Sequence, residues 1–282
     1  MTKPPSDLLT LSMIVKDEAR TIARTLASVK PFLDRWVILD TGSADDTRDV
    51  VRRELAGVPG KLQECLFVDF ETTRNLALAR CGNATEYILW LDADDELRGG
   101  AELRAFLESE RARAEPDREA YLVRVDTVVS FNSVRVVRSR AGLRFKRAVH
   151  EILERPDRAP PLHCVPGASI LHHPDRGSIE RSHARRERDI GLLGEALRKD
   201  PNDTRAAFYL ASTYLWAGRH DEAVSAFRRR VAMGGWREEV YQAKFGLAEA
   251  AQKRGDPWPD VLLLYLDAHA FAPHRAEPLH RV

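Results

Sequence analysis

Residues 87–96 read YILWLDADDE, a run of bulky apolar side chains followed at once by carboxylates. A short apolar run of this kind is typical of a buried strand. Carboxylates that directly follow a strand lie at its carboxyl end, where open α/β sheets bind ligands. Asp92 and Asp94 are spaced so that both can reach such a crevice, and Mg²⁺ and Mn²⁺ prefer oxygen ligands. The alternative is a solvated turn that caps a helix.

Short apolar runs and longer amphipathic stretches also alternate before and after this segment. This alternation predicts an α/β fold with a mainly parallel sheet. Polar clusters follow the first two strands, at residues 16–18 and 40–43. The expected strands cover residues 8–15, 36–39, 66–70, 87–91, 120–129 and 133–138, and the expected helices cover 19–29, 46–55 and 72–79.

The character of the chain changes to helix after about residue 177. We expect a linker through the proline-rich residues 156–166, an α/β domain over 1–176 and a helical region over 177–282. The segment with Leu210, Ala211, Tyr214, Gly218, Ala223 and Phe227 matches the spacing of a tetratricopeptide helix pair, and Leu247, Ala248, Ala251 and Gly255 repeat its first half. The alternative is an ordinary pair of helical hairpins.

The composition excludes several classes of protein. The 44 Lys and Arg residues against 43 Asp and Glu give a net charge of +1, so no global field attracts a polyanion. No apolar run has the length of a membrane span or a signal peptide, and we expect a cytoplasmic protein. The three cysteines form no C-x-x-C pair, which argues against a disulfide framework or a thiolate zinc site. Phosphate-loop, dinucleotide-binding and serine-hydrolase motifs are also missing from the sequence.

Four segments in order resemble the donor-binding half of a family 2 glycosyltransferase with the GT-A fold. They are SMIVKDE at 12–18, VILDTGSADDT at 37–47, TTRNLALA at 72–79 and YILWLDADDEL at 87–97. RFKRAVHE at 144–151 and ILH at 170–172 resemble segments of bacterial members that carry a tetratricopeptide tail. The resemblance therefore implies a GT-A domain, with a Rossmann-like mainly parallel sheet, followed by an all-α tetratricopeptide-like region.

The resemblance also implies a donor, a metal and their ligands. The donor would be a nucleotide-diphosphate sugar, and the metal would be Mn²⁺ or Mg²⁺. A metal at the leaving diphosphate stabilises the charge that develops there as the glycosidic bond breaks. The implied roles are nucleotide lining for Met13, Val15 and Glu18, base binding for Asp40, base or ribose contact for Arg74, ribose or metal contact for Asp92, and the main metal ligand for Asp94.

Three later residues have more than one interpretation. The resemblance makes His172 a further metal or diphosphate contact, and the alternative is a histidine of the core or a hinge. Inverting transfer needs a base that takes the acceptor proton, and Glu151 is our candidate. The alternatives are a metal ligand at His150, a structural Glu151, or a base at Asp95 or Asp126.

The acceptor is not indicated by any motif. A cationic run could hold a diphosphate or an acidic acceptor, or could be a solvated strand face. The helical region would dock the acceptor or a second subunit, or would brace the catalytic domain. Competing functions are transfer to a modified nucleic-acid base, which we do not favour, and a non-catalytic scaffold with a relic front domain. The run consists of Arg135, Arg138, Arg140, Arg144, Lys146 and Arg147.

Overall fold

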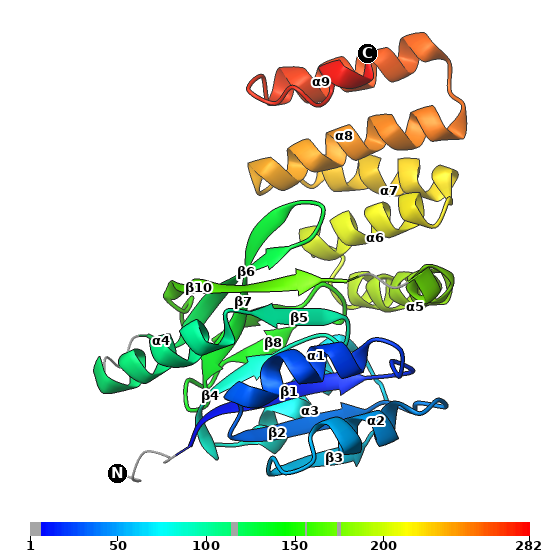
Figure 1. Ribbon diagram of the computed structural model, residues 1–282. Coiled ribbons are helices and arrows are strands. Elements are labelled where there is room, and N and C mark those ends of the chain that lie inside the picture. Colours follow the sequence, from blue (N-terminus) through cyan, green and yellow to red (C-terminus); the bar gives the residue numbers. More distant parts are fainter. Residues whose placement is uncertain (1–6, 114–117, 156, 174–175) are drawn as a thin grey trace. The chain divides into compact units, whose positions relative to one another are not determined.

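Figure 1 shows the computed structural model, which describes residues 7–113, 118–155, 157–173 and 176–282. The chain forms two compact units, Met1–Arg147 with Glu151–Asp175 and Ala148–His150 with Arg176–Val282. None of the helices in these described ranges is both long enough and apolar enough to cross a membrane.

The first unit is built on an eight-stranded sheet with the order β3-β2-β1-β4-β7-β6-β10-β5. Strands β3, β2, β1 and β4 are parallel, β7 is antiparallel to both neighbours, and β5 is antiparallel to β10. The predicted mainly parallel α/β sheet is confirmed. The strands are β1 Asp7–Val15, β2 Arg35–Asp40, β3 Gly60–Glu64, β4 Thr85–Trp90, β5 Asp95–Arg98, β6 Ala120–Asp126, β7 Ser130–Arg138 and β10 Leu162–His172, and β8 Arg144–Lys146 pairs with β9 Ile152–Glu154 in a separate ribbon.

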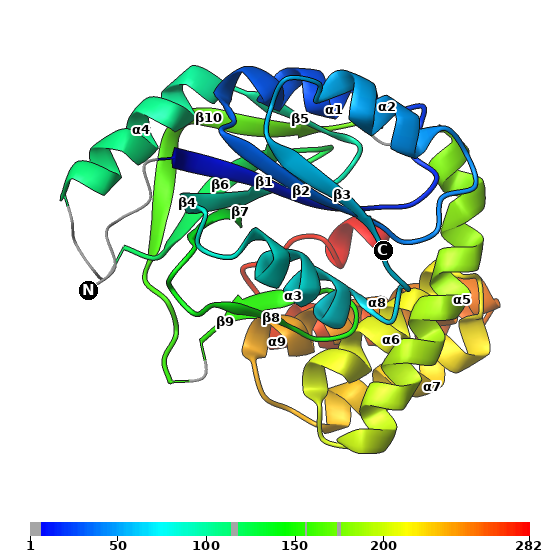
Figure 2. The same ribbon diagram turned by 90° about the horizontal axis from the view of Figure 1, so that it is seen from below.

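Helices cover both faces of this sheet. Figure 2 shows α1, α2 and α4 along one face and α3 against the other. The larger core lies under the first group, with Met13, Ile22 and Leu103 fully buried, and Leu78 of α3 packs with Ile88 on the opposite face. The sheet is therefore buried on both faces, as parallel sheets require. The bounds are α1 Ile22–Val29, α2 Thr47–Glu54, α3 Phe70–Cys81 and α4 Gly100–Arg113.

The predicted strand over residues 66–70 is wrong. The third strand is β3, Gly60–Glu64, while Leu66 and Val68 are exposed and Phe70 begins α3. Strand β3 lies at the sheet edge, so it carries mostly polar side chains and no apolar run marks it. Its Gly60 packs against the ring of Trp36, which a Cβ atom would approach to 2.2 Å.

The predicted linker over 156–166 is also wrong in part, because β10 begins at Leu162. This strand pairs with β6, and the register shifts between Cys164 and Ser169. Residue 156 lies outside the described residues. Pro166 and Gly167 lie in the irregular part of the strand, where proline and glycine often mark a bulge.

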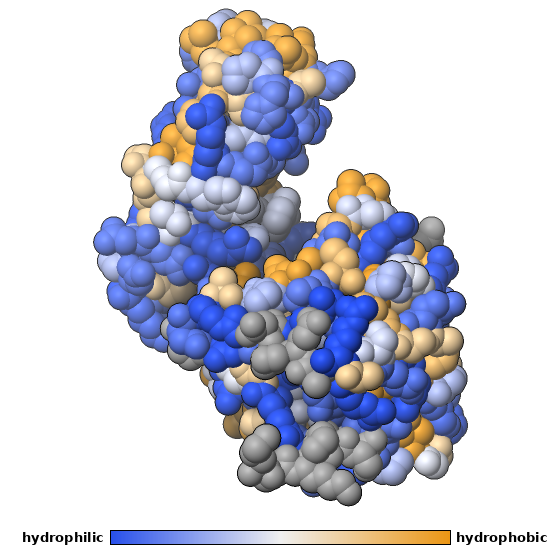
Figure 3. Space-filling view, turned by 90° about the vertical axis from the view of Figure 1, so that its left-hand side faces the viewer, coloured by the Kyte–Doolittle hydropathy of each residue, from blue (hydrophilic) through white to orange (hydrophobic). Residues whose placement is uncertain are grey.

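The second unit is helical, as predicted. Figure 1 shows α6, α7, α8 and α9 packed as successive antiparallel helices, in the manner of tetratricopeptide pairs. Ala211, Phe227, Ala248 and Tyr265 are buried between them. The outer side of α9 exposes Leu263 and Leu266, and hydrophobic residues gather at the top of Figure 3, where this helix lies. The bounds are α5 Arg176–Lys199, α6 Thr204–Trp216, α7 His220–Ala232, α8 Arg237–Arg254 and α9 Trp258–Phe271.

The contact between α7 and α8 depends on a glycine. A Cβ atom at Gly246 would lie 2.5 Å from the ring of buried Phe227. We expect Gly246→Ala to lower the free energy of unfolding by about 1–2 kcal/mol, because overpacking outweighs the helix propensity that alanine gains. Urea denaturation measures this change. In α5, Gly191 has open space around its Cβ position, so Gly191→Ala should stabilise by up to about 1 kcal/mol, and equal effects of the two substitutions would contradict the packing argument.

Candidate active site

The carboxylates that follow β4 lie in a tight turn that leads into β5. The Asp92 amide donates to Asp95 Oδ2 at 3.0 Å, and the Asp95 amide donates to the Asp92 carbonyl at 3.2 Å. The hydroxyl of Thr25 in α1 donates to the Ala93 carbonyl at 2.8 Å. The turn is thus held from both sides, and Asp94 is left at its outer end, half-buried.

The pairing of β5 with β10 brings a distant histidine to this turn. His172 lies opposite Asp95 in the antiparallel register, and the His173 amide donates to the Asp94 carbonyl at 2.9 Å. His172 Nδ1 is 3.1 Å from Asp95 Oδ1 and 3.6 Å from Asp94 Oδ1. The structure therefore brings together Asp94 and His172, two of the residues predicted to bind metal.

Among the described residues, Asp94, Asp95 and His172 form the one group of three potential metal-binding side chains whose donor atoms converge, within 4.8 Å of one another. Two carboxylate oxygens and an imidazole nitrogen suit Mn²⁺, and carboxylates together with a substrate diphosphate suit Mg²⁺. These residues fit a divalent cation. Sequence reasoning considered Asp95 only as a base, although its position next to Asp94 was a signal for this cluster.

Burial and neighbouring groups shift the pKa values of Asp94 and His172. Burial raises the pKa of Asp94 to about 6, against the effect of His172, and the charges of Asp92 and Asp95 raise it further. The hydrogen bond to Asp95 raises the pKa of His172 above its ordinary value, although burial lowers it. Without a cation, the folded protein therefore favours a protonated Asp94 in mildly acidic solution.

This shift predicts a pH dependence of stability. A carboxyl group with a raised pKa in the folded state stabilises it below the ordinary pKa, 3.8, and this contribution is lost as the pH rises through about 6. In metal-free buffer, the unfolding free energy of the wild type minus that of Asp94→Asn should fall between pH 4 and pH 7, by on the order of 1–3 kcal/mol. Denaturant titrations at several pH values measure the difference. A difference that rises with pH would contradict the shift.

Asp92, itself partly exposed, pairs with arginines that are largely buried. Its Oδ1 accepts from Arg74 Nη2 at 2.7 Å, and Arg135 Nη1 lies 3.4 Å from its Oδ2 and 3.1 Å from Asp95 Oδ2. Burial alone would raise the pKa of Asp92, but the two guanidinium groups hold it well below its usual value. Both guanidinium groups also lie over the ring of Trp90, at 4.6 Å and 4.0 Å. Asp92 is thus kept ionised and fixed beside the cluster.

The predicted nucleotide-lining residues lie in β1 or just beyond it. Met13 and Val15 are almost fully buried in the main core, so their side chains are not open to a nucleotide and the predicted lining would fall to their backbone. Residues two apart share one face of a strand, and here that face points into the core. Glu18 lies beyond the strand, where its carboxylate accepts from the Thr21 hydroxyl at 2.7 Å, and its charge contributes to the raised pKa of Asp94.

Asp40 builds the turn after β2. Its Oδ1 accepts from the amides of Gly42 and Ser43 at 2.9 and 2.7 Å, and Gly42 has a φ of 101°, which favours glycine. Oδ2 is buried without a hydrogen-bond partner in the described part of the chain. The side chain is fully buried, so in this structure Asp40 shapes the loop and offers no open contact to a base.

Glu151 and His150 are adjacent in sequence but belong to different units. Glu151 Oε1 accepts from Arg74 Nε at 2.5 Å, so the candidate base also anchors the Asp92 network. The ring of His150 stacks on Tyr209 at 3.7 Å, and burial lowers the pKa of His150 to about 4. His150 is no member of the metal-binding group in the described residues, and the structure gives it a packing role.

The cationic run also divides. Arg135 and Arg138 are largely buried and ion-paired, the latter with Glu86 at 2.5 Å, while Arg144 and Lys146 are exposed on β8. The six residues therefore do not form one solvated strand face. Arg135 was grouped with this run, and its role in the carboxylate network could not be read from the strand pattern.

Parts of this chain are similar to known proteins. Residues 10–115 match the model described as glycosyl transferase family 2. A TPR repeat-containing protein of Synechococcus elongatus is 36% identical over 151 residues, which cover 52% of this chain and 35% of that protein. The glycosyltransferase SunS of Bacillus subtilis is 22% identical over 240 residues, which cover 81% of this chain and 54% of SunS. The chain thus spans about a third and about half of these two relatives.

A solved structure is also similar to the chain. S. aureus TarS 1-349 in complex with UDP-GlcNAc has 13% sequence identity and a TM-score of 0.49, and the match covers 87% of this chain and 88% of TarS 1-349. The family match covers Asp94 and Asp95, whereas His172 in β10 lies beyond it. Residues 10–115 of the chain thus match the glycosyl transferase family 2, and a tetratricopeptide-like helical region follows the sheet.

Proposed function

We propose that this protein transfers a sugar from a nucleotide-diphosphate sugar to an acceptor, with a divalent cation and inversion at the anomeric carbon. The observation that supports this most directly is the convergence of Asp94, Asp95 and His172 at the carboxyl edge of the sheet. The ion-paired Asp92, fixed by Arg74, adds a carboxylate next to it that could bind a ribose hydroxyl.

In the proposed reaction, an acceptor nucleophile attacks the anomeric carbon, and the bond from that carbon to the diphosphate oxygen breaks. Mn²⁺ or Mg²⁺ held by Asp94, His172 and Asp95 would supply positive charge that stabilises the leaving nucleoside diphosphate. Glu151 is our proposed base. The bond from Arg74 uses its Oε1, and Oε2 would accept the acceptor proton.

The proposal also includes the domain boundary, the role of the helical region and the cellular location. We propose that the catalytic domain covers residues 1–176 and the helical region residues 177–282. The helical region would dock the acceptor or a second subunit. Cys65, Cys81 and Cys164 are free thiols, which fits the proposed cytoplasmic location because disulfides are rare there.

The test is a thermal-shift screen of nucleotide sugars with Mn²⁺ and with EDTA. A ligand that binds the folded state raises its stability by RT ln(1 + [L]/Kd), so the true donor raises Tm only with metal present. Incubation of that donor with candidate acceptors, followed by NMR of the anomeric proton, then tests transfer and inversion. If no nucleotide sugar shifts Tm under either condition, the proposed function is wrong. That result would favour a non-catalytic scaffold.

A further inference from the structure

The proposed base Glu151 lies in the loop of the ribbon formed by β8 and β9. Lys146 pairs with Ile152, so residues 147–151 connect the two strands. Glu151 is the last residue of this loop, and β9 begins directly after it. The position of its carboxylate therefore depends on the contacts that hold the loop.

Both ends of the loop are tied to α3. At the first end, the Arg147 amide donates to Glu71 Oε2 at 2.5 Å. At the other end, Arg74 Nε donates to Glu151 Oε1 at 2.5 Å. Glu71 and Arg74 are three residues apart in α3, so they share one face of that helix. One helix thus holds both ends of the loop, and residues 148–150 form its tip.

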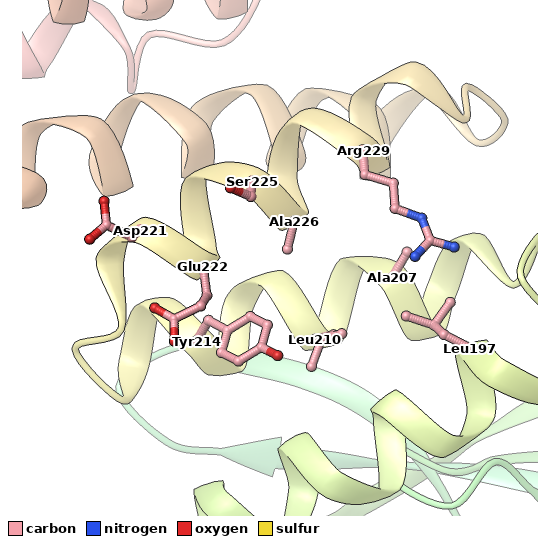
Figure 4. A pocket seen from close by; sticks show the side chains of 9 residues that line it. All are labelled: Leu197, Ala207, Leu210, Tyr214, Asp221, Glu222, Ser225, Ala226 and Arg229. Atoms are coloured by element: carbon pink, nitrogen blue, oxygen red, sulfur yellow. The ribbon is translucent and has the colours of Figure 1, made fainter.

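The loop tip packs with the helical unit instead. Val149 is buried in a hydrophobic cluster with residues of α5 and α6, and the ring of His150 stacks on Tyr209 of α6 at an interplanar angle of 17°. Figure 4 shows two members of this cluster, Leu197 of α5 and Ala207 of α6, close to each other. The loop tip is therefore part of the core of the helical unit.

The backbone of the loop is unfavourable on its own. Arg147 and His150 have φ values of 89° and 53°, in the left-handed region that residues with a Cβ atom rarely adopt. Such conformations persist only where surrounding contacts hold them. The bond to Glu71 holds Arg147, and the stack on Tyr209 holds His150. Without that stack, His150 would return to commoner conformations, and the peptide bond that it shares with Glu151 would move with it.

We infer that Tyr209 is a positioning residue for Glu151, so that the helical region takes part in placing the proposed base. This inference rests on the proposed function, in which Glu151 accepts the acceptor proton. Consecutive Cα atoms are about 3.8 Å apart, so a displacement of His150 is passed on directly to Glu151. A reacting group that is misplaced by about 1 Å can lose on the order of 10²-fold in rate.

Hydrogen exchange tests the role of the stack without any substrate. In Tyr209→Ala, the Arg147 amide should exchange at least about fivefold faster than in the wild type, because the loop opens more often. Mass spectrometry of peptides that cover residues 145–152 measures this rate. Tyr209→Phe keeps the aromatic ring and should exchange at the wild-type rate. Unchanged exchange in folded Tyr209→Ala would overturn the inference, whether or not the protein transfers a sugar.

The matched control is Tyr214→Ala, which makes the same change five residues further along α6. Tyr214 is also half-buried, but it packs against the cluster that contains Phe227 and lies toward the other end of α6 from Ala207 (Figure 4). Loop exchange in this variant should equal that of the wild type. Faster loop exchange in Tyr214→Ala as well would show general loosening of the helical unit and would contradict a specific role of Tyr209.

Catalysis tests the consequence for Glu151. With the donor from the thermal-shift screen and water as the acceptor, the release of nucleoside diphosphate gives kcat and the donor KM. Tyr209→Ala should lower kcat about tenfold to hundredfold, because the base is misplaced. The donor KM should stay within about threefold, since the base acts on the acceptor, and Tyr209→Phe should restore kcat.

Glu151→Gln separates failure of this inference from failure of the proposed base. If Glu151→Gln loses activity while Tyr209→Ala keeps the wild-type kcat, Tyr209 does not position the base and the inference is wrong. If Glu151→Gln itself keeps the wild-type kcat, the proposed base is wrong, and the inference falls with it.

Discussion

Asp94→Asn is expected to abolish most of the cation-supported activity. Asparagine is nearly isosteric but offers a neutral oxygen, so the cation next to His172 loses a charged ligand 3.6 Å from Nδ1. We expect kcat/KM for the donor to fall about 10²- to 10³-fold, the range seen when a group that stabilises transition-state charge is removed. Mn²⁺ affinity, measured by titration calorimetry, should fall at least about tenfold.

The control for this substitution is Asp157→Asn, which removes an exposed carboxylate paired with Arg155 at 2.9 Å in the same unit. It should leave both kcat/KM and Mn²⁺ affinity within about twofold of wild type, because exposed pairs contribute little. Raising the Mn²⁺ concentration should restore part of the Asp94→Asn rate if the loss lies in cation affinity. If Asp94→Asn keeps the full Mn²⁺-dependent rate, Asp94 is not a ligand of the catalytic cation.

The strands and the acidic site residues could be predicted from the sequence where an apolar run is followed directly by charged residues. Strands β1, β2 and β4 are central and buried on both faces, so their hydrophobicity marks them clearly, and their carboxyl ends carry the acids that were singled out. Edge strand β3 has no such signal, whereas Leu66 and Val68 look like a strand but are exposed. An apolar run shows that a side chain can be buried, but only tertiary packing shows that it is.

The arrangement of the site depended on pairings between distant segments. The register of β5 with β10 joins Asp95 to His172 across 77 residues, and no local pattern indicates that register. The family resemblance supplied Asp94 and His172, but it could not show that Arg74 joins Asp92 to Glu151. The charge balance of the whole chain hides this network, in which acids and arginines alternate through a buried region.

The network predicts that Arg135 is a major source of stability in the first unit. Asp95 is fully buried, and Arg135 lies 3.1 Å from its Oδ2. Arg135→Met would leave this carboxylate without its guanidinium partner in a region of low dielectric. We expect the free energy of unfolding to fall by about 3–5 kcal/mol, the usual cost of breaking a buried ion pair from one side. Urea denaturation followed by tryptophan fluorescence measures the loss.

Two comparisons separate lost charge from lost packing, since Arg135 also covers the ring of Trp90 at 4.0 Å. Arg124→Met removes an arginine from an exposed pair with Asp126 and should cost less than about 1 kcal/mol. Asp95→Asn in the Arg135→Met background removes the unpaired buried charge. The double variant should therefore lose less unfolding free energy than the two single variants together, with a coupling of about 1–3 kcal/mol. A strictly additive double variant would show that Arg135 does not stabilise the protein through Asp95.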